Sequence, residues 1–300
     1  MSNFEMRDLL PNACKEITLC FLGLNIIKTK TTLFANQKDL ICKVLCKFGM
    51  NECKSLSTPI QRNLNLRVTD VCDENLPYRQ LVGHLMYIML GSRPDLCFAI
   101  TYFSQFQNNF NREHWVYLKN VLKYLKSTEN YALKFEKSTD KTTNSVFSAF
   151  VDADFASDIT DRKSISGYCI KMFGNIIFWK SKKQVTVALS SCEAEYVALA
   201  NCVMECNFLS QLLNEISNYS IYPINIYEDN QSCIKMAETL ETKRTKHIDV
   251  KHHYIRDCID KNKIVLNYIP TNEQEADIFT KGLPTVKFKY FRDKLKILNV

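Results

Sequence analysis

The chain has 300 residues, of which 46% are hydrophobic, and 39 lysines and arginines against 32 aspartates and glutamates give it a formal charge of +7. This apolar content excludes a mainly disordered chain, and the length favours two domains. The basic excess is mild, so it permits a nucleic-acid partner without requiring one.

Neither a membrane segment nor a secretion signal is predicted. No apolar run approaches the roughly 18 residues that a membrane helix needs, and the first ten residues are too acidic and polar for a signal peptide. The 13 cysteines are odd in number and contain no Cys-x-x-Cys pair, which indicates reduced thiols. We therefore expect an intracellular protein, cytoplasmic or nuclear, that is not secreted and does not bind membranes.

The first half is expected to be a mostly helical subdomain spanning residues 1–140. Apolar residues recur at helical spacing over four stretches, which are residues 37–48, 78–90, 94–106 and 114–125. Two short strands around a polar turn are predicted within 22–33. The chain turns polar over 131–145, and its run at 137–144 is the best linker candidate, so we expect a domain boundary there.

The second half, residues 145–300, has the pattern of an α/β domain. Three early strands that can pair as a meander are predicted at 146–151, 166–172 and 176–179. A helix over 193–213 follows, and further strands are predicted at 224–227 and 265–269 with helices between and after them. This alternation favours a layered α/β fold.

Carboxylates in the second half are attached directly to apolar segments. Asp152 ends the first strand, Glu193 or Glu195 lies in the following helix, Asp229 ends a later strand, and Asp277 is expected to open the last helix. Clustered carboxylates suit phosphodiester hydrolysis by two divalent ions about 3.5 to 4 Å apart, and Mg²⁺ prefers such oxygen ligands. Neither a Gly-x-Ser-x-Gly elbow nor a Walker lysine loop competes with this interpretation.

Seven motifs occur in one order in this half: VDADFA (151–156), DRKSISGY (161–168), WKSKKQ (179–184), ALSSCEAEY (188–196), EDNQS (228–232), KRTKHID (243–249) and ADIFTK (276–281). Together they resemble the C-terminal ribonuclease H domain of copia-type LTR retrotransposon Pol polyproteins. Segments at 4–9, 58–59, 78–87, 93–95 and 114–115 resemble the region that joins the reverse transcriptase to that domain. The resemblance covers nearly the whole chain.

The resemblance implies a ribonuclease H-like domain with a five-stranded mixed sheet at 145–300, and a C-terminal remnant of the reverse transcriptase at 1–140. It implies endonucleolytic cleavage of the RNA strand of RNA/DNA hybrids with two Mg²⁺ ions, or Mn²⁺ as the alternative. The missing reverse transcriptase portion would be a partner. The Tyr-x-Asp-Asp polymerase turn of the family is absent, because the chain has no adjacent aspartate pair.

The resemblance also assigns residues. It implies Asp152, Glu195, Asp229 and Asp277 as catalytic residues and metal ligands. Glu195 is preferred because it lies in the family's Ala-Glu-Tyr setting, but Glu193 stays open. The two are separated by about 200° around a helix, so only one can face the sheet. Many ribonucleases H carry a histidine before the last acid, which residues 269–277 lack, so product release is slower or His247 replaces it.

Basic and polar residues around these acids are expected to contact the nucleic-acid backbone. They are Arg162, Lys163, Lys182, Lys183, Asn230, Gln231, Arg244 and Lys246. His247, His252 and His253 are open between metal ligands and polar helix residues, and the second is favoured because no cysteine pair stands at finger spacing. Two other functions stay open: a silent or co-opted remnant that only binds nucleic acid, and another polynucleotidyl reaction such as that of a resolvase or integrase. Asp229-Asn230 and the Ala-Glu-Tyr helix favour the ribonuclease H.

Overall fold

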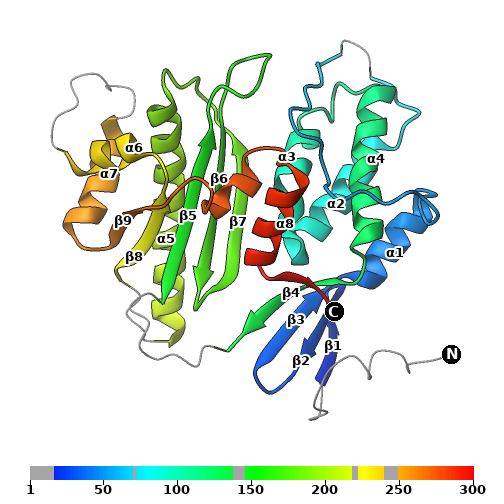
Figure 1. Cartoon of the computed structure of the whole chain (residues 1–300), viewed down its shortest axis with the longest axis horizontal. Coiled ribbons are helices and arrows are strands. Elements are labelled where there is room, and N and C mark those ends of the chain that lie inside the picture. The colour runs from blue at the N-terminus through cyan, green and yellow to red at the C-terminus, as the bar shows by residue number, and fades with distance from the viewer. Residues whose placement is uncertain (1–16, 70–71, 138–145, 218–221, 240–248) are drawn as a thin grey trace.

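The computed structural model describes residues 17–69, 72–137, 146–217, 222–239 and 249–300. It contains two five-stranded sheets, shown in Figure 1, with helices packed beside each. The first sheet has the order β1-β2-β3-β4-β10 and the second β7-β6-β5-β8-β9. Because β10 comes from the C-terminus and joins the first sheet, the two halves are interleaved in the chain.

The first sheet is antiparallel throughout the described residues. Its strands are β1 (Ile17–Phe21), β2 (Leu24–Lys28), β3 (Thr32–Asn36), β4 (Tyr131–Glu136) and β10 (Ile297–Asn299). The sequence predicted only two strands within 22–33, and it read the residues of β4 as part of a polar stretch. That interpretation of 131–136 was wrong, because Ala132 and Leu133 are buried between neighbouring strands.

All four helices predicted for the first half are present. They are α1 (Lys38–Lys47), α2 (Tyr78–Ser92), α3 (Cys97–Ser104), which follows the 3₁₀ turn η1 (Pro94–Leu96), and α4 (Arg112–Ser127). In α1 the apolar residues at helical spacing, Ile41, Val44 and Leu45, are the buried ones. Asn111 starts α4 by accepting the backbone N–H groups of Glu113 and His114, as a helix N-cap does.

The second sheet is mixed, which confirms the predicted α/β domain with a five-stranded mixed sheet. Its strands are β5 (Phe147–Asp154), β6 (Ile165–Met172), β7 (Asn175–Lys183), β8 (Ile224–Glu228) and β9 (Ile264–Tyr268). The first three pair as an antiparallel meander, and β8 and β9 run parallel to β5. The long helix α5 (Ser191–Ser217) packs across β5 and β6.

Shorter helices complete this half: α6 (Gln231–Glu238), α7 (Asp249–Asp260), the 3₁₀ helix η3 (Glu275–Phe279) and α8 (Thr285–Lys294). Asp277 lies in η3, so the expectation that it opens the last helix was wrong. Pro284 lies between η3 and α8, and it has the extended backbone of a helix N-cap residue. No helix among the described residues is long and apolar enough to cross a membrane.

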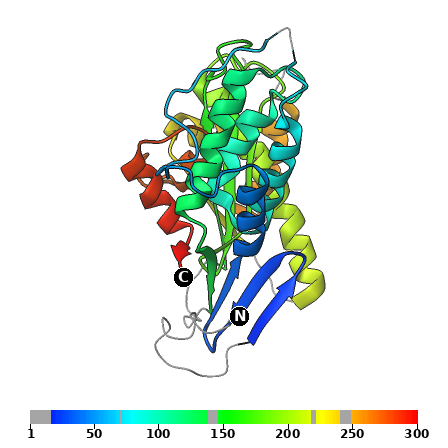
Figure 2. The same cartoon turned by 90° about the vertical axis from the view of Figure 1, so that its right-hand side faces the viewer.

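The two halves share one apolar core. It combines side chains of α2, α3 and α4 with Ile165 of β6, Phe279 of η3 and Phe288 of α8. The ring of Phe288 meets that of Tyr124 edge-on, with 5.6 Å between centroids. Both views place the C-terminus beside the first sheet (Figures 1 and 2). The predicted linker falls almost wholly on residues 138–145, outside the described residues, so the domain boundary stays a prediction.

Candidate active site

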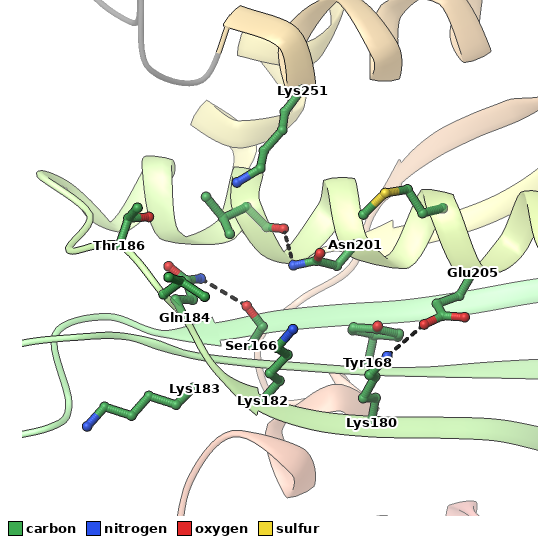
Figure 3. A pocket seen from close by; sticks show the side chains of 13 residues that line it. Ser166, Tyr168, Lys180, Lys182, Lys183, Gln184, Thr186, Asn201, Glu205 and Lys251 are labelled. Atoms are coloured by element: carbon green, nitrogen blue, oxygen red, sulfur yellow. Dashed lines mark hydrogen bonds and ion pairs between the residues drawn. The ribbon is translucent and has the colours of Figure 1, made fainter.

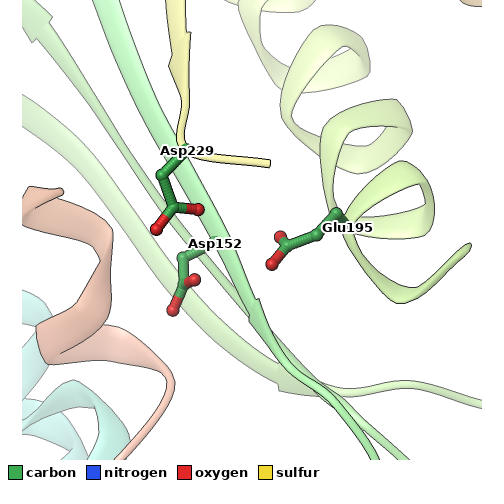
Figure 4. A group of neighbouring side chains, drawn as sticks. All are labelled: Asp152, Glu195 and Asp229. Carbon is green, nitrogen blue, oxygen red and sulfur yellow. The ribbon is translucent and has the colours of Figure 1, made fainter. Parts of the chain in front are cut away.

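Three carboxylates converge at one edge of the second sheet. Strands β5 and β8 are parallel, with Phe150 opposite Tyr227, so their carboxyl ends lie together. Asp152 is near the end of β5, Asp229 follows β8 directly, and Glu195 reaches toward them from α5 (Figure 4). One oxygen of each lies within 4.8 Å of the others. We call Asp152, Glu195 and Asp229 the three-acid cluster.

The two candidate glutamates of α5 have different surroundings. Glu193 accepts the backbone N–H of Leu189 at 2.8 Å, while its own N–H donates to the Ser190 hydroxyl at 3.2 Å. This pattern is close to a capping box, except that the glutamate accepts from Leu189, the residue before the N-cap Ser190. Glu195, two residues later, points instead toward the strand ends, as helical geometry requires. Of the two, only Glu195 is a member of the cluster.

The surroundings of the cluster do not compensate the negative charge that its buried carboxyl groups would carry when ionised. Asp152 is 3% exposed and Glu195 is 6% exposed. Burial raises the pKa of Asp152 to about 7, although Lys281 opposes the rise. Burial and then the carboxylate of Glu228 raise the pKa of Glu195 to about 12, and its Oε2 has no hydrogen-bond partner among the described residues. Oxygen donors in this state fit a divalent cation, which Asp152, Glu195 and Asp229 could hold.

Sequence reasoning missed Glu228, the last residue of β8. Its side chain is fully buried, its Oε1 accepts the N–H of Asn230 at 2.9 Å, and its Oε2 has no partner among the described residues. Burial raises the pKa of Glu228 well above its ordinary value. A signal was present, because Glu228 continues the alternation of Ile224 and Ile226, which face the core.

Asp277 reaches the same edge but is not a member of the three-acid cluster. The ammonium of Lys281 lies 2.6 Å from its Oδ1 and 3.5 Å from Oδ2 of Asp152, and Lys287 of α8 donates to its Oδ2. Burial lowers the pKa of Lys281, but the carboxylates of Asp152 and Asp277 outweigh it and the pKa is raised. The structure therefore places the fourth predicted acid, Asp277, at the site in an ion-pair network with Lys281 and Lys287.

Two contacts fix η3 at the strand ends. The buried amide of Gln274 donates to the carbonyl oxygens of Val151, at 2.9 Å, and Tyr227, at 3.3 Å, and so joins β5 to β8. Gly167 of β6 lies opposite Asp152, and a Cβ there would come within 2.6 Å of the Thr280 methyl group. This close approach lets the Thr280 hydroxyl donate to Asp152 Oδ2.

Of the predicted nucleic-acid contacts, Lys182 and Lys183 line a pocket of about 320 Å³ between β7 and α5 (Figure 3). Lys180 and Lys251 also line it. Gln184 in its wall donates to Ser166 Oγ at 2.9 Å and to the carbonyl of Ala194 at 2.8 Å, so the pocket adjoins the turn that carries Glu195. Lys183 is engaged by Asp158 at 2.5 Å.

The other predicted contacts are placed differently. Arg162 is exposed and Lys163 pairs with Asp161 at 3.5 Å. The side chain of Asn230 caps α6 by accepting the N–H of Cys233 at 3.0 Å, while Gln231 is exposed at the start of that helix. Arg244, Lys246 and His247 lie outside the described residues, as does the side chain of His252; His253 is exposed.

Comparison with known proteins then identifies the family. No family model matches the chain. It is 36% identical over 302 residues to the retrovirus-related Pol polyprotein from transposon TNT 1-94 of Nicotiana tabacum, which covers 97% of this chain and 22% of that protein. It is 32% identical over 284 residues to the corresponding polyprotein from transposon RE1 of Arabidopsis thaliana, covering 93% and 19%. The chain belongs to the copia-type, retrovirus-related Pol polyproteins.

This copia-type Pol chain spans about a fifth of the length of those relatives, 22% and 19%. Among solved structures it is similar to LC11-RNase H1, with 14% sequence identity and a TM-score of 0.35, over 45% of this chain and 91% of that one. A second structure of that enzyme, crystallised with an RNA/DNA hybrid, gives the same TM-score of 0.35.

Proposed function

We propose that this copia-type Pol chain cleaves the RNA strand of RNA/DNA hybrids endonucleolytically and requires divalent metal ions, with Mg²⁺ as the physiological ion and Mn²⁺ as a substitute. The observation that carries the proposal is the three-acid cluster, in which oxygens from a strand, a second strand end and a helix lie within 4.8 Å of one another. Membership of a Pol family makes nucleic acid the fitting substrate class.

In this proposal Asp152, Glu195 and Asp229 hold one ion, and Asp277 contributes to a second. When bound, such ions activate a water molecule and stabilise the leaving oxygen of the phosphodiester. The other residues position these ligands. Thr280 orients Asp152 through its hydroxyl, and Gln274 holds the ends of β5 and β8 together.

The pocket beside α5 is proposed to contact the hybrid's phosphates. Lys182 is exposed, and neither it nor Lys251 has an ion-pair partner within the described part of the chain. These lysines come from different elements, β7 and α7, so their charges converge on one place. Phosphate and 2′-hydroxyl contacts carry little sequence information, so we expect little sequence preference. Residues 1–140 are proposed as the end of a reverse transcriptase whose remainder helps to hold the hybrid.

The test is cleavage of matched RNA/DNA, RNA/RNA and DNA/DNA duplexes in Mg²⁺. We expect cutting only of the RNA strand in the hybrid. Asp229→Asn removes one charged ligand at nearly constant shape, and should lower the rate by roughly 10² to 10³-fold, because metal ions supply several kcal/mol of transition-state stabilisation.

The matched control is Asp154→Asn, which changes the same residue type on β5 outside the three-acid cluster. The loss of cleavage rate in Asp154→Asn should be much smaller. Hybrid binding, measured by fluorescence anisotropy, should persist in both variants. Cutting of all three duplexes, or of DNA alone, would contradict the proposal. Hybrid binding by the parent chain without any cleavage would favour the silent, nucleic-acid-binding remnant.

A further inference from the structure

The fourth acid is already neutralised by the protein itself. Asp277 is fully buried, yet both of its oxygens face lysine ammonium groups. Lys281 lies 2.6 Å from Oδ1 and Lys287 donates to Oδ2. No lysine contact of this kind reaches Glu195 or Asp229 among the described residues. The positive charge of the lysines is therefore concentrated at Asp277, away from Glu195 and Asp229.

Both lysine side chains reach solvent. They are 34% and 31% exposed, so an ammonium that a metal ion displaces can return to water, and the ion then compensates the buried carboxylate of Asp277 in its place. In the position where it donates to Asp277, the Lys287 ammonium also lies 3.5 Å from the carbonyl of Thr271 and 5.3 Å from the centre of the Phe291 ring.

We propose that Lys281 and Lys287 are internal cations that compete with the second metal ion for Asp277. The first ion meets a single lysine contact at the three-acid cluster, that of Lys281 with Asp152 at 3.5 Å, whereas the second binds only as both lysines leave Asp277. This inference rests on the proposed function, since it assumes that the cluster binds metal. It predicts two binding steps of unequal affinity in the absence of nucleic acid.

The position of Lys287 makes it the sharper probe. It extends from α8, which is anchored by Phe288 and Phe291 in the shared core, so its removal should leave the helix in place. Lys281 also lies 3.5 Å from Asp152, so it contacts a member of the three-acid cluster as well as Asp277. Methionine keeps most of the length and apolar stem of lysine and deletes only the charge.

The experiment is a Mn²⁺ binding isotherm of the full chain without nucleic acid. Calorimetry measures the heat of binding, and electron paramagnetic resonance measures the concentration of free Mn²⁺. The parent chain should bind one ion tightly and a second weakly. In Lys287→Met the second ion should bind about two- to fivefold more tightly, the effect of losing one partly exposed ion pair, while the first is unchanged. Lys289→Met, an exposed lysine on the same helix, should leave both steps unaltered.

A second variant keeps the test decisive if Lys287→Met does not fold. Lys281→Met should lower the thermal unfolding temperature in EDTA, because Asp152 and Asp277 then repel each other, and Mn²⁺ should raise that temperature more than in the parent chain. Unchanged second-step affinity, or an unchanged response to Mn²⁺, would overturn the inference while leaving the proposed function intact. A parent chain that binds no Mn²⁺ at all would overturn both.

Discussion

Asp152 shows how a single residue can make the metal-free site unfavourable. Its carboxylate is almost fully buried, and within the described part of the chain only Thr280 and Lys281 offset the loss of water. Glu195 and Glu228 share this environment, and burial raises the pKa of all three groups. Ionising a buried acid with a raised pKa costs free energy, and a bound cation lowers that free-energy cost.

This cost predicts a pH dependence of stability. The folded-state pKa of Asp152 is about 7 against an ordinary value of 3.8, so its stabilising contribution is complete below the ordinary value and is lost as the pH rises through about 7. In EDTA the free energy of unfolding of the parent chain should therefore fall relative to that of Asp152→Asn between about pH 4 and pH 7.5. Urea unfolding of both proteins across this range measures the difference.

The expected sign of this effect is specific. The variant should gain relative stability toward high pH, and Mg²⁺ should reduce the difference because it binds only the parent's intact cluster. A constant difference between the two proteins at all pH values would contradict the raised pKa of Asp152. Lys289→Met serves as a control for the effect of an exposed charge.

At the scale of elements, the site depends on how closely η3 approaches β6. Gly167 makes this possible, because a Cβ there would lie 2.6 Å from the Thr280 methyl group, 2.8 Å from Phe279 Cβ and 3.0 Å from the Phe279 carbonyl carbon. The last of these atoms is backbone, which cannot move aside as a flexible side chain does. The antiparallel pairing of β5 with β6 also places Gly167 opposite Asp152.

Gly167→Ala is therefore expected to push η3 from the sheet. Overpacking of this kind costs about 1 to 3 kcal/mol, and cleavage should fall further than this loss of stability explains, because Asp277 and Thr280 move with η3. Urea unfolding and the hybrid cleavage rate measure the two effects. The control is Gly83→Ala in α2, where a Cβ meets nothing within 4 Å, and alanine favours the helix. Equal behaviour of the two variants would contradict the packing argument.

At the scale of the whole molecule, the C-terminal segment ties the halves together. Strand β10 pairs with β4, Lys296 contacts Glu136 at 2.8 Å, and α8 packs into the core of the first half. A linker at 137–144 would therefore connect two halves that are also joined noncovalently. The sequence predicted that residues 145–300 fold alone. Isolating them would expose the apolar surface of Phe288 and Phe291, which disfavours independent folding.

We predict that a chain cut by protease within 137–144 keeps its two fragments together. They should co-elute in size-exclusion chromatography under native conditions and separate in urea, because the shared apolar core and the β4–β10 pairing resist dissociation. Deleting residues 296–300 should weaken this association. Fragments that separate without denaturant would show that the halves are independent domains, as the polar linker alone suggested.

The sequence by itself determined the elements whose signals are local. Ile41, Val44 and Leu45 recur at helical spacing and α1 forms there. The strands of the meander β5, β6 and β7 coincide with apolar runs of the sequence, and only two residues separate β6 from β7. The sequence also predicted Asp152 and Asp229 at strand ends, with Glu193 or Glu195 on the helix between them, and the choice of Glu195 came from the family resemblance. Periodicity and chain order carry the first part of this information, whereas the parallel pairing of β5 with β8 comes from the structure.

Only the tertiary structure decided the rest. The pairing of β10 with β4 joins residues more than 150 positions apart, and a strand of three residues carries no periodicity of its own. The place of Asp277 is set by Gln274 and Gly167, and its pairing with Lys281 and Lys287 depends on where α8 packs. Glu228 is fully buried and its charge acts on Glu195, although the two residues lie on separate elements, β8 and α5. Burial and charge compensation are properties of neighbours in space, and the order of residues along the chain does not specify them.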